Sequence, residues 1–192
     1  MIDPQSLEAL RDGSVEAFDA HFARAADRLL VYVRVRIGPG LAIRIDEEDI
    51  LQDVFLSARA ARDGFRGETY ASFVSWLCAI ARSRLADAGR SANREPRSAA
   101  FTRVLSLAED RHTGPLTAAA RVDNRSTLAD AIAALPQGDR EVLVAHFFEG
   151  LPQADIARET GRSASDVQRA VARALVAVGR PLRAALGEGG TS

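Results

Sequence analysis

The sequence predicts an all-α protein made of two small helical domains joined by a flexible linker. Apolar residues recur every three or four positions in both halves, and no stretch shows strand alternation. Between them, residues 91–125 turn to Ala, Ser, Thr, Pro, Gly and Arg. A chain of 192 residues is long enough for two domains that each bury a modest core. We place the first domain at 1–92, the linker at 93–124 and the second domain at 125–186.

Four helices are expected in the first domain. Apolar spacing over residues 7–37 indicates two helices, interrupted by RDGS and ended by GPG. A third begins at Asp46, whose carboxylate can cap free backbone N–H groups while Asp49 reaches back as in a capping box. After a loop around RDGFRGE, apolar residues from Phe73 to Leu85 mark a fourth helix running toward Arg90. Cys78, the single cysteine, lies in this apolar stretch and is expected in the core.

The second domain is expected to hold a helix-turn-helix. Its helices are predicted near 126–135, 138–149, 152–160 and 163–179, with Gly and Pro at the breaks. The third ends at Gly161, a tight turn follows, and Ser163 can cap the fourth with Asp166 at its third position. This is the layout of a helix-turn-helix.

The last of these helices has one apolar face and one face suited to DNA. The apolar face comprises Val167, Ala170, Val171, Ala174, Leu175 and Val178. Arginine can fork onto guanine or bind phosphate, and a helix N-terminus also favours phosphate. The candidate DNA-binding residues are therefore Arg162, Ser163, Ser165, Gln168, Arg169 and Arg173. A plain helical hairpin with a solvated charged face is the alternative interpretation.

Neither an enzyme, a metal site nor a cofactor is expected. His21, His112 and His146 lie in different segments without partners at metal or triad spacing, and there is no Gly-rich phosphate loop. The chain has 25 basic and 26 acidic residues, so net charge alone does not predict a partner. The start MIDPQSLEALRDGS lacks a signal-peptide pattern, and no uncharged apolar stretch of about 18 residues occurs. A soluble, cytoplasmic protein without membrane insertion is expected.

Five fragments in order resemble a bacterial RNA polymerase sigma factor of the extracytoplasmic-function group. They are DEEDILQDVFLSA, FRGE, SWLCAIARSRLAD, LADAIAALPQGDREVLVAHFFEGL and ADIARETGRSASDVQRAVARAL, and together they cover nearly the whole chain. The resemblance implies a sigma-two-like first domain, which binds polymerase and opens the downstream (−10) promoter element. It also implies a sigma-four-like second domain, which reads the upstream (−35) element.

The resemblance gives the acidic run near residue 46 a partner. It is similar to the stretch with which the family holds the clamp of the largest polymerase subunit, and the implied contact residues are Asp46, Glu47, Glu48, Asp49, Gln52 and Asp53. Contact of the second domain with the flap of the second subunit and control by an anti-sigma factor are also implied. Capping and the helix dipole explain the first four acids without a partner, but they leave Asp53 without a role.

Local charge turns positive over residues 82–103, where a strand of promoter DNA could lie. The resemblance implies that the loop at 62–72 and the fourth helix take up the non-template strand. The implied contacts with the downstream element are Arg66, Arg82, Arg84 and Arg90. Trp76 could stack on a base, but its spacing favours a place in the core.

The sequence therefore predicts a factor that binds RNA polymerase core enzyme, directs it to particular promoters and helps to melt them. Two alternatives remain open. One is a sigma-like decoy that binds an anti-sigma factor without reading promoters. The other is a regulator that binds DNA through the helix-turn-helix without polymerase.

Overall fold

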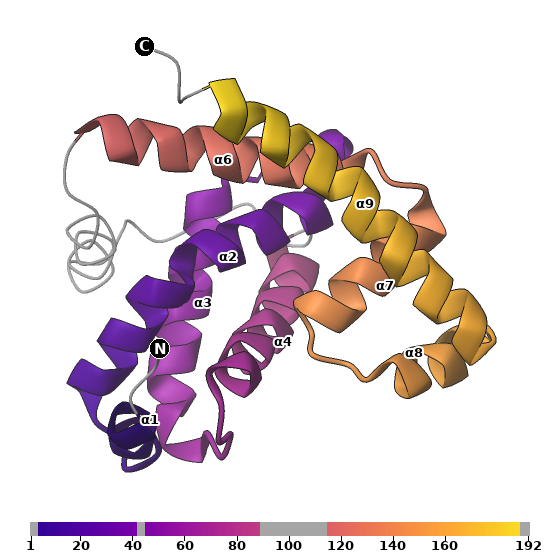
Figure 1. Ribbon diagram of the computed structural model, residues 1–192. Helices are drawn as coiled ribbons and strands as arrows, with labels where there is room; N and C mark the ends of the chain where they lie inside the picture. Colours follow the sequence, from indigo (N-terminus) through magenta and orange to yellow (C-terminus); the bar gives the residue numbers. More distant parts are fainter. Residues whose placement is uncertain (1–3, 42–44, 89–114, 189–192) are drawn as a thin grey trace. The chain divides into compact units, whose positions relative to one another are not determined.

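A computed structural model describes residues 4–41, 45–88 and 115–188 (Figure 1). The chain divides into two compact units, Met1–Ala118 and Ala119–Ser192. All the secondary structure in the described residues is helical, which confirms the predicted all-α class. Within these residues, no helix is long and apolar enough to cross a membrane.

Unit 1 contains four α-helices in its described part, with α2, α3 and α4 packed against one another (Figure 1). They are α1 (Pro4–Arg11), α2 (Val15–Leu41), α3 (Glu47–Ala61) and α4 (Tyr70–Ala88), and a short 3-10 turn, η1 (Arg62–Gly64), follows α3. Helix α2 runs on to Leu41, past the Gly-Pro-Gly at which we expected it to end. Pro39 removes one backbone donor, but its restricted φ is compatible with a helix.

Short polar side chains set the starts of two helices in unit 1. Ser14 Oγ accepts the Ala17 N–H at 3.1 Å, directly after Gly13 with a φ of +83°. Asp46 Oδ1 accepts the Glu48 N–H at 2.8 Å, so Asp46 is the N-cap of α3 as predicted. These caps explain why RDGS separates α1 from α2 and why the acidic run begins a helix.

Four phenylalanine rings form the centre of unit 1. Phe18 and Phe22 of α2 lie 5.9 and 5.1 Å from Phe55 of α3, measured between ring centroids, and Phe73 of α4 lies 6.1 Å from Phe18. All four are fully buried. Cys78 is buried as well, as predicted. The aromatic cluster joins the middle of α3 and the first turn of α4 to α2.

Unit 2 contains all but the first turn of α6 (Pro115–Ala133), together with α7 (Gln137–Phe147), α8 (Gln153–Thr160) and α9 (Ala164–Glu188). Helix α6 begins inside the segment predicted as linker, because Pro115 is harmless at a first helical position and an alanine run follows. Helix α9 continues beyond the predicted end at residue 179, through Pro181. Both prolines fit within these helices because proline's restricted φ is compatible with a helix.

The core of unit 2 brings α7, α8 and α9 together. Val142 of α7, Ile156 of α8 and Val167, Ala170 and Val171 of α9 form one buried cluster. Leu135 and Phe148, which flank α7, are also buried. Because each helix contributes to one cluster, the angle between α8 and α9 depends on how both pack on α7.

Candidate nucleic-acid interface

The α8–α9 segment has the geometry of a helix-turn-helix. Gly161 adopts a left-handed φ of +67° and ends α8, with its N–H donated to the carbonyl of Ala157. Ser163 then starts α9: its Oγ accepts the Asp166 N–H at 3.1 Å and donates to Asp166 Oδ2 at 2.6 Å. The predicted turn and cap are both confirmed. Only glycine adopts that φ without strain, so the turn depends on Gly161.

One face of α9 is buried and the other is open to solvent. Val167, Ala170, Ala174 and Val178 lie on the buried side, as predicted. Leu175 was expected with them, but its residue is 49% exposed. It lies about 100° round the helix from Ala174, outside the buried stripe. The exposed side of the first turns carries Ser165, Gln168, Arg169 and Ala172.

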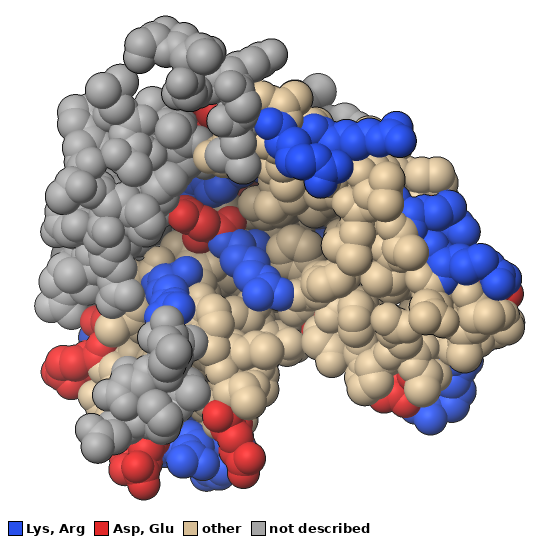
Figure 2. All heavy atoms as spheres, in the orientation of Figure 1, with Lys and Arg blue, Asp and Glu red and all other residues tan. Residues whose placement is uncertain are grey.

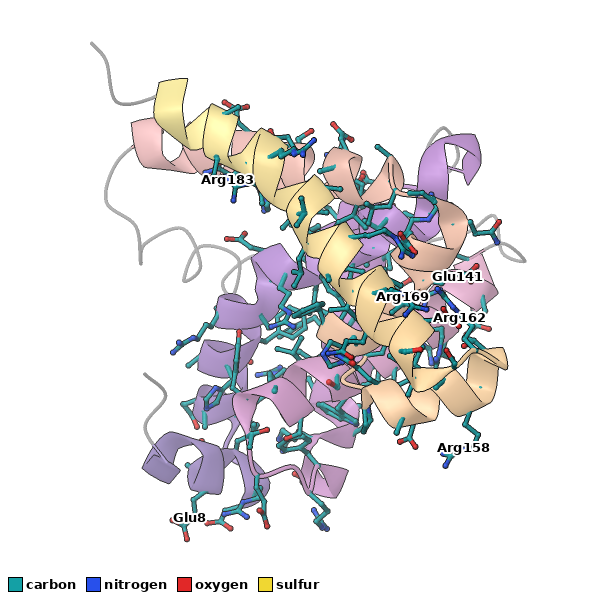
Figure 3. All side chains as sticks on the ribbon, turned by 45° about the vertical axis from the view of Figure 1, so that its right-hand side comes forward. Glu8, Glu141, Arg158, Arg162, Arg169 and Arg183 are labelled. Carbon is teal, nitrogen blue, oxygen red and sulfur yellow. The ribbon has the colours of Figure 1, made fainter. Side chains whose placement is uncertain are left out.

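Every predicted DNA-binding arginine of unit 2 has a protein partner. Arg169 Nη2 donates to Asp166 Oδ1 at 2.5 Å, and Arg162 Nη1 donates to the carbonyl of Gly138 at 3.0 Å. Figure 3 shows Arg162 and Arg169 near the turn between α8 and α9, with Arg183 much further along α9. Both arginines are thus held close to the start of the exposed face.

Arg173 forms a bidentate pair with Asp139 of α7. Its Nε and Nη2 donate to the two carboxylate oxygens of Asp139 at 2.9 and 2.7 Å. The hydrogen bond from Arg173 lowers the pKa of Asp139, and Asp139 in turn raises the pKa of Arg173. The pKa of Asp166 is lowered as well, first by its hydrogen bond from Ser163 and then by that from Arg169.

Asp139 is the residue of this site that the sequence did not reveal. It precedes Arg173 by 34 positions, so no local spacing pattern joins the two residues. A carboxylate in the first turn of α7 is equally well explained by the helix dipole. Only the packing of α7 against α9 makes it a partner of the candidate DNA-binding helix.

The arginines of unit 2 gather along α9 on the face drawn in Figure 2. In the same view, acidic and basic side chains are interleaved at the end of unit 1 that carries α1 and η1. Outward-facing arginines suit a phosphate backbone, and on α9 two of them, Arg169 and Arg173, are each also paired with an aspartate.

The acidic start of α3 is partly exposed. Asp46 and Glu48 are exposed, while Glu47, Asp49 and Asp53 are half-buried. Glu47 also pairs with Arg34 of α2, with 3.4 Å between Oε1 and Nε. Gln52 is only 2% exposed, so the expected surface role does not fit this side chain. Its position in the apolar stripe of α3, between Leu51 and Val54, explains the burial.

The loop before α4 is anchored by an aromatic contact and a cap. Phe65 is buried, and its ring centroid lies 5.5 Å from that of Phe73 and 5.4 Å from that of Trp76. Thr69 Oγ1 accepts the Ser72 N–H, and Ser72 Oγ accepts the Thr69 N–H, both at 3.1 Å. This reciprocal cap starts α4. Trp76 packs against both rings but is only half-buried, whereas its spacing favoured a place in the core.

The arginines that were predicted to contact the downstream element lie in different surroundings. Arg66 Nη1 donates to the carbonyls of Asp63 and Phe65 at 2.6 and 3.0 Å, which closes the loop. Arg84 pairs with Asp87 one turn further along α4 at 3.6 Å, and Arg82 is exposed on α4. Arg90 lies outside the described residues.

Family models and curated relatives agree on the class of protein. The model of Sigma-70 region 2 matches residues 22–95, and that of Sigma-70, region 4 matches residues 125–178. The sigma factor CarQ of Myxococcus xanthus is 32% identical over 148 residues, which cover 75% of this chain and 76% of CarQ. The chain belongs to the sigma-70 family of RNA polymerase sigma factors.

Further relatives place the chain within that family. SigD of Mycobacterium tuberculosis, named an ECF RNA polymerase sigma factor, is 28% identical over 75% of this chain and 66% of SigD. A probable sigma factor of Xanthomonas campestris, RfaY, is 31% identical over 68% of this chain, and the match spans 32% of RfaY. A solved structure of CnrH in complex with the cytosolic domain of CnrY covers 95% of this chain and 97% of that chain, with 24% identity and a TM-score of 0.45. Within the sigma-70 family, this chain is a member of the extracytoplasmic-function group.

Proposed function

We propose that this sigma factor binds RNA polymerase core through the acidic start of α3, melts the downstream element with the α4 region and reads the upstream element with α8–α9. It acts without a cofactor or catalysis of its own, in the cytoplasm, at the nucleoid when part of holoenzyme. The proposal rests on one observation: acidic and basic side chains are concentrated on different helices. Carboxylates begin α3, whereas arginines accompany the exposed face of a capped helix-turn-helix.

The proposed core-binding face consists of Asp46, Glu48, Asp49 and Asp53, with Glu47 at its edge. Asp46 is accounted for by its cap, but capping gives Asp53 no role because Asp53 lies beyond the first helical turn. Carboxylates spread over the start of a helix suit a basic protein surface, such as the clamp of the largest polymerase subunit. Gln52 is left out because it is buried.

In the proposed downstream contact, one arginine holds the loop before α4 in shape and others contact the DNA. Arg66 braces the loop through two carbonyls, so its role is to hold the loop in shape. Arg82 and Arg84 then present positive charge from α4 to a DNA strand, followed by Arg90. Half-buried Trp76 supports the loop through Phe65 and is not proposed to stack on a base.

The proposed upstream contact uses the start of α9. Gln168 is exposed and can hydrogen-bond adenine in two places, and Ser165 can bind either a base edge or phosphate. Arg162, Ser163, Arg169 and Arg173 add phosphate contacts and helix positioning. Contact of unit 2 with the flap of the second polymerase subunit, and capture by an anti-sigma factor, remain predictions from family membership.

The test is core binding and promoter use measured on the same set of variants of the full chain. Reversal of Asp49 and Asp53 to arginine should abolish capture of core polymerase. Gln168→Ala and Arg169→Ala should spare that capture and weaken transcription from promoters identified by sequencing the transcripts that rise on overexpression. Equal loss of core binding in both sets would refute the division of labour.

The same measurements separate the two alternatives. A sigma-like decoy would bind an anti-sigma factor but would start no transcripts with core polymerase. A polymerase-independent regulator would shift promoter DNA in a gel without core enzyme. Transcription that requires core polymerase together with this chain supports the proposed function over both.

A further inference from the structure

Asp139 and Arg173 form an ion pair whose two members differ strongly in exposure. The side chain of Asp139 is 11% exposed and that of Arg173 is 57% exposed. The carboxylate therefore lies beneath the guanidinium, on the α7 side of α9. Arg173 uses Nε and Nη2 for this pair, and a guanidinium has five N–H donors in a fixed plane. Its remaining donors lie on the edge away from Asp139.

A free arginine side chain has many rotamers, and ordering it on a ligand lowers the affinity gained from the contact. Two hydrogen bonds to a buried carboxylate order Arg173 before any DNA arrives. Arg162 is braced in a related way, by the carbonyl of Gly138 in the same first turn of α7. The first turn of α7 thus supports two arginines of the α8–α9 segment.

We propose that Asp139 is a positioning residue that holds the outer N–H edge of Arg173 toward a phosphate of the upstream promoter element. The inference rests on the proposed function of unit 2 and names the contact that Arg173 makes there. Arg173 lies in the third turn of α9, and in helix-turn-helix proteins the first turn meets base edges. A cation further along the helix is better placed for the backbone, which Arg173 would bind as a charge-assisted hydrogen-bond donor.

The direction in which Asp139→Asn changes the affinity for DNA distinguishes a positioning role from a simple effect of charge. Asp139→Asn removes a negative charge close to the DNA-binding face, which by charge alone should tighten binding to a polyanion. If Asp139 positions Arg173, the same change should weaken binding because the guanidinium loses its support. Glu141→Gln is the matched control: it removes a carboxylate from the same helix, where Gln137 Nε2 donates to Glu141 at 2.9 Å.

The experiment uses holoenzyme reconstituted from core polymerase and the full chain. A pool of DNA duplexes randomised across the upstream element is first selected for binding to the wild-type holoenzyme. The duplex that is most enriched then serves as the probe for all variants. Asp139→Asn should bind it about tenfold more weakly, as expected for one lost charge-assisted hydrogen bond. The slope of log affinity against log salt should fall by about 1, the change expected for one phosphate contact. Glu141→Gln should bind as tightly as wild type or more tightly.

Exchanging the charges of Asp139 and Arg173 tests whether Asp139 acts only by holding α7 against α9. In the double variant Asp139→Arg with Arg173→Asp, an ion pair between α7 and α9 can form again, but a carboxylate now faces the DNA. We expect wild-type thermal unfolding by circular dichroism and binding no better than that of Asp139→Asn. If Asp139→Asn does not fold, Arg173→Lys replaces it, because lysine keeps the charge but cannot be held by Asp139 while donating from a second edge. Arg173→Lys should then bind about tenfold more weakly than wild type, and binding as tight as wild type would overturn the inference.

The inference is overturned if Asp139→Asn binds at least as tightly as wild type, if its salt slope is unchanged, or if the swap restores binding. Gln168→Ala separates these failures from failure of the proposed function. When Gln168→Ala weakens binding and Asp139→Asn does not, only the positioning role is wrong. When the wild-type holoenzyme selects no upstream sequence, the proposed function fails, and this inference fails with it.

Discussion

Replacing Gly67 by alanine should disrupt the loop that precedes α4. A Cβ at this position would lie 2.3 Å from Ser72 Oγ and 2.5 Å from Phe65 Cζ. Neither group can yield easily, because Ser72 Oγ also donates to the Thr69 carbonyl at 2.6 Å and the Phe65 ring is buried. Gly64, in the turn before Phe65, has no atom within 4 Å of a Cβ.

The expected cost follows from these contacts. Added atoms in a well-packed site cost about 1 to 3 kcal/mol. Displacement of the Phe65 ring would also forfeit part of the roughly 1.5 to 3 kcal/mol that burial of a phenylalanine provides. We therefore expect Gly67→Ala to lower the free energy of unfolding of unit 1 by about 2 kcal/mol. Gly64→Ala should change it by less than about 0.5 kcal/mol.

Urea unfolding of the full chain, followed by fluorescence of Trp76, measures this difference directly. Trp76 is the single tryptophan and contacts the Phe65 ring, so its signal reports unit 1. Gly67→Ala should move the midpoint to lower urea, and it should reduce promoter opening because the α4 loop loses its shape. Equal midpoints for the two alanine variants would refute the packing argument, since only one of the two sites is crowded.

Three further outcomes are expected. Asp46→Ala should destabilise unit 1 by about 1 kcal/mol in urea because the cap on the Glu48 N–H is lost, while Asp46→Asn keeps the cap and should weaken only core capture. Ser163→Ala should cost roughly 0.5 to 2 kcal/mol in thermal unfolding and weaken promoter binding by the holoenzyme, since α9 loses its first-turn cap. The depressed pKa of Asp139 contributes stability that is present above its ordinary value of 3.8 and is lost as the pH falls through the lower folded value. Asp139→Asn should therefore flatten the acid side of a curve of urea midpoint against pH, and an unchanged curve would contradict the pairing with Arg173.

The sequence alone determined the features that depend on neighbours within about one helical turn. Gly161 and Ser163 predicted the turn and the start of α9, and Asp46 predicted the start of α3. Helical spacing predicted the all-α class, and five ordered fragments indicated the family. These signals work because caps, left-handed glycines and apolar stripes act over a few residues.

Tertiary structure decided what each side chain in those elements faces. Gln52 belongs to the acidic run in sequence, yet α3 turns it into the core, whereas Leu175 lies outside the stripe that α9 buries. The partner of Arg173 stands 34 residues away on another helix. Periodicity gives the direction of a side chain around its own helix but not the neighbour that packs against it. That neighbour depends on how α7, α8 and α9 share one core, which no local pattern encodes.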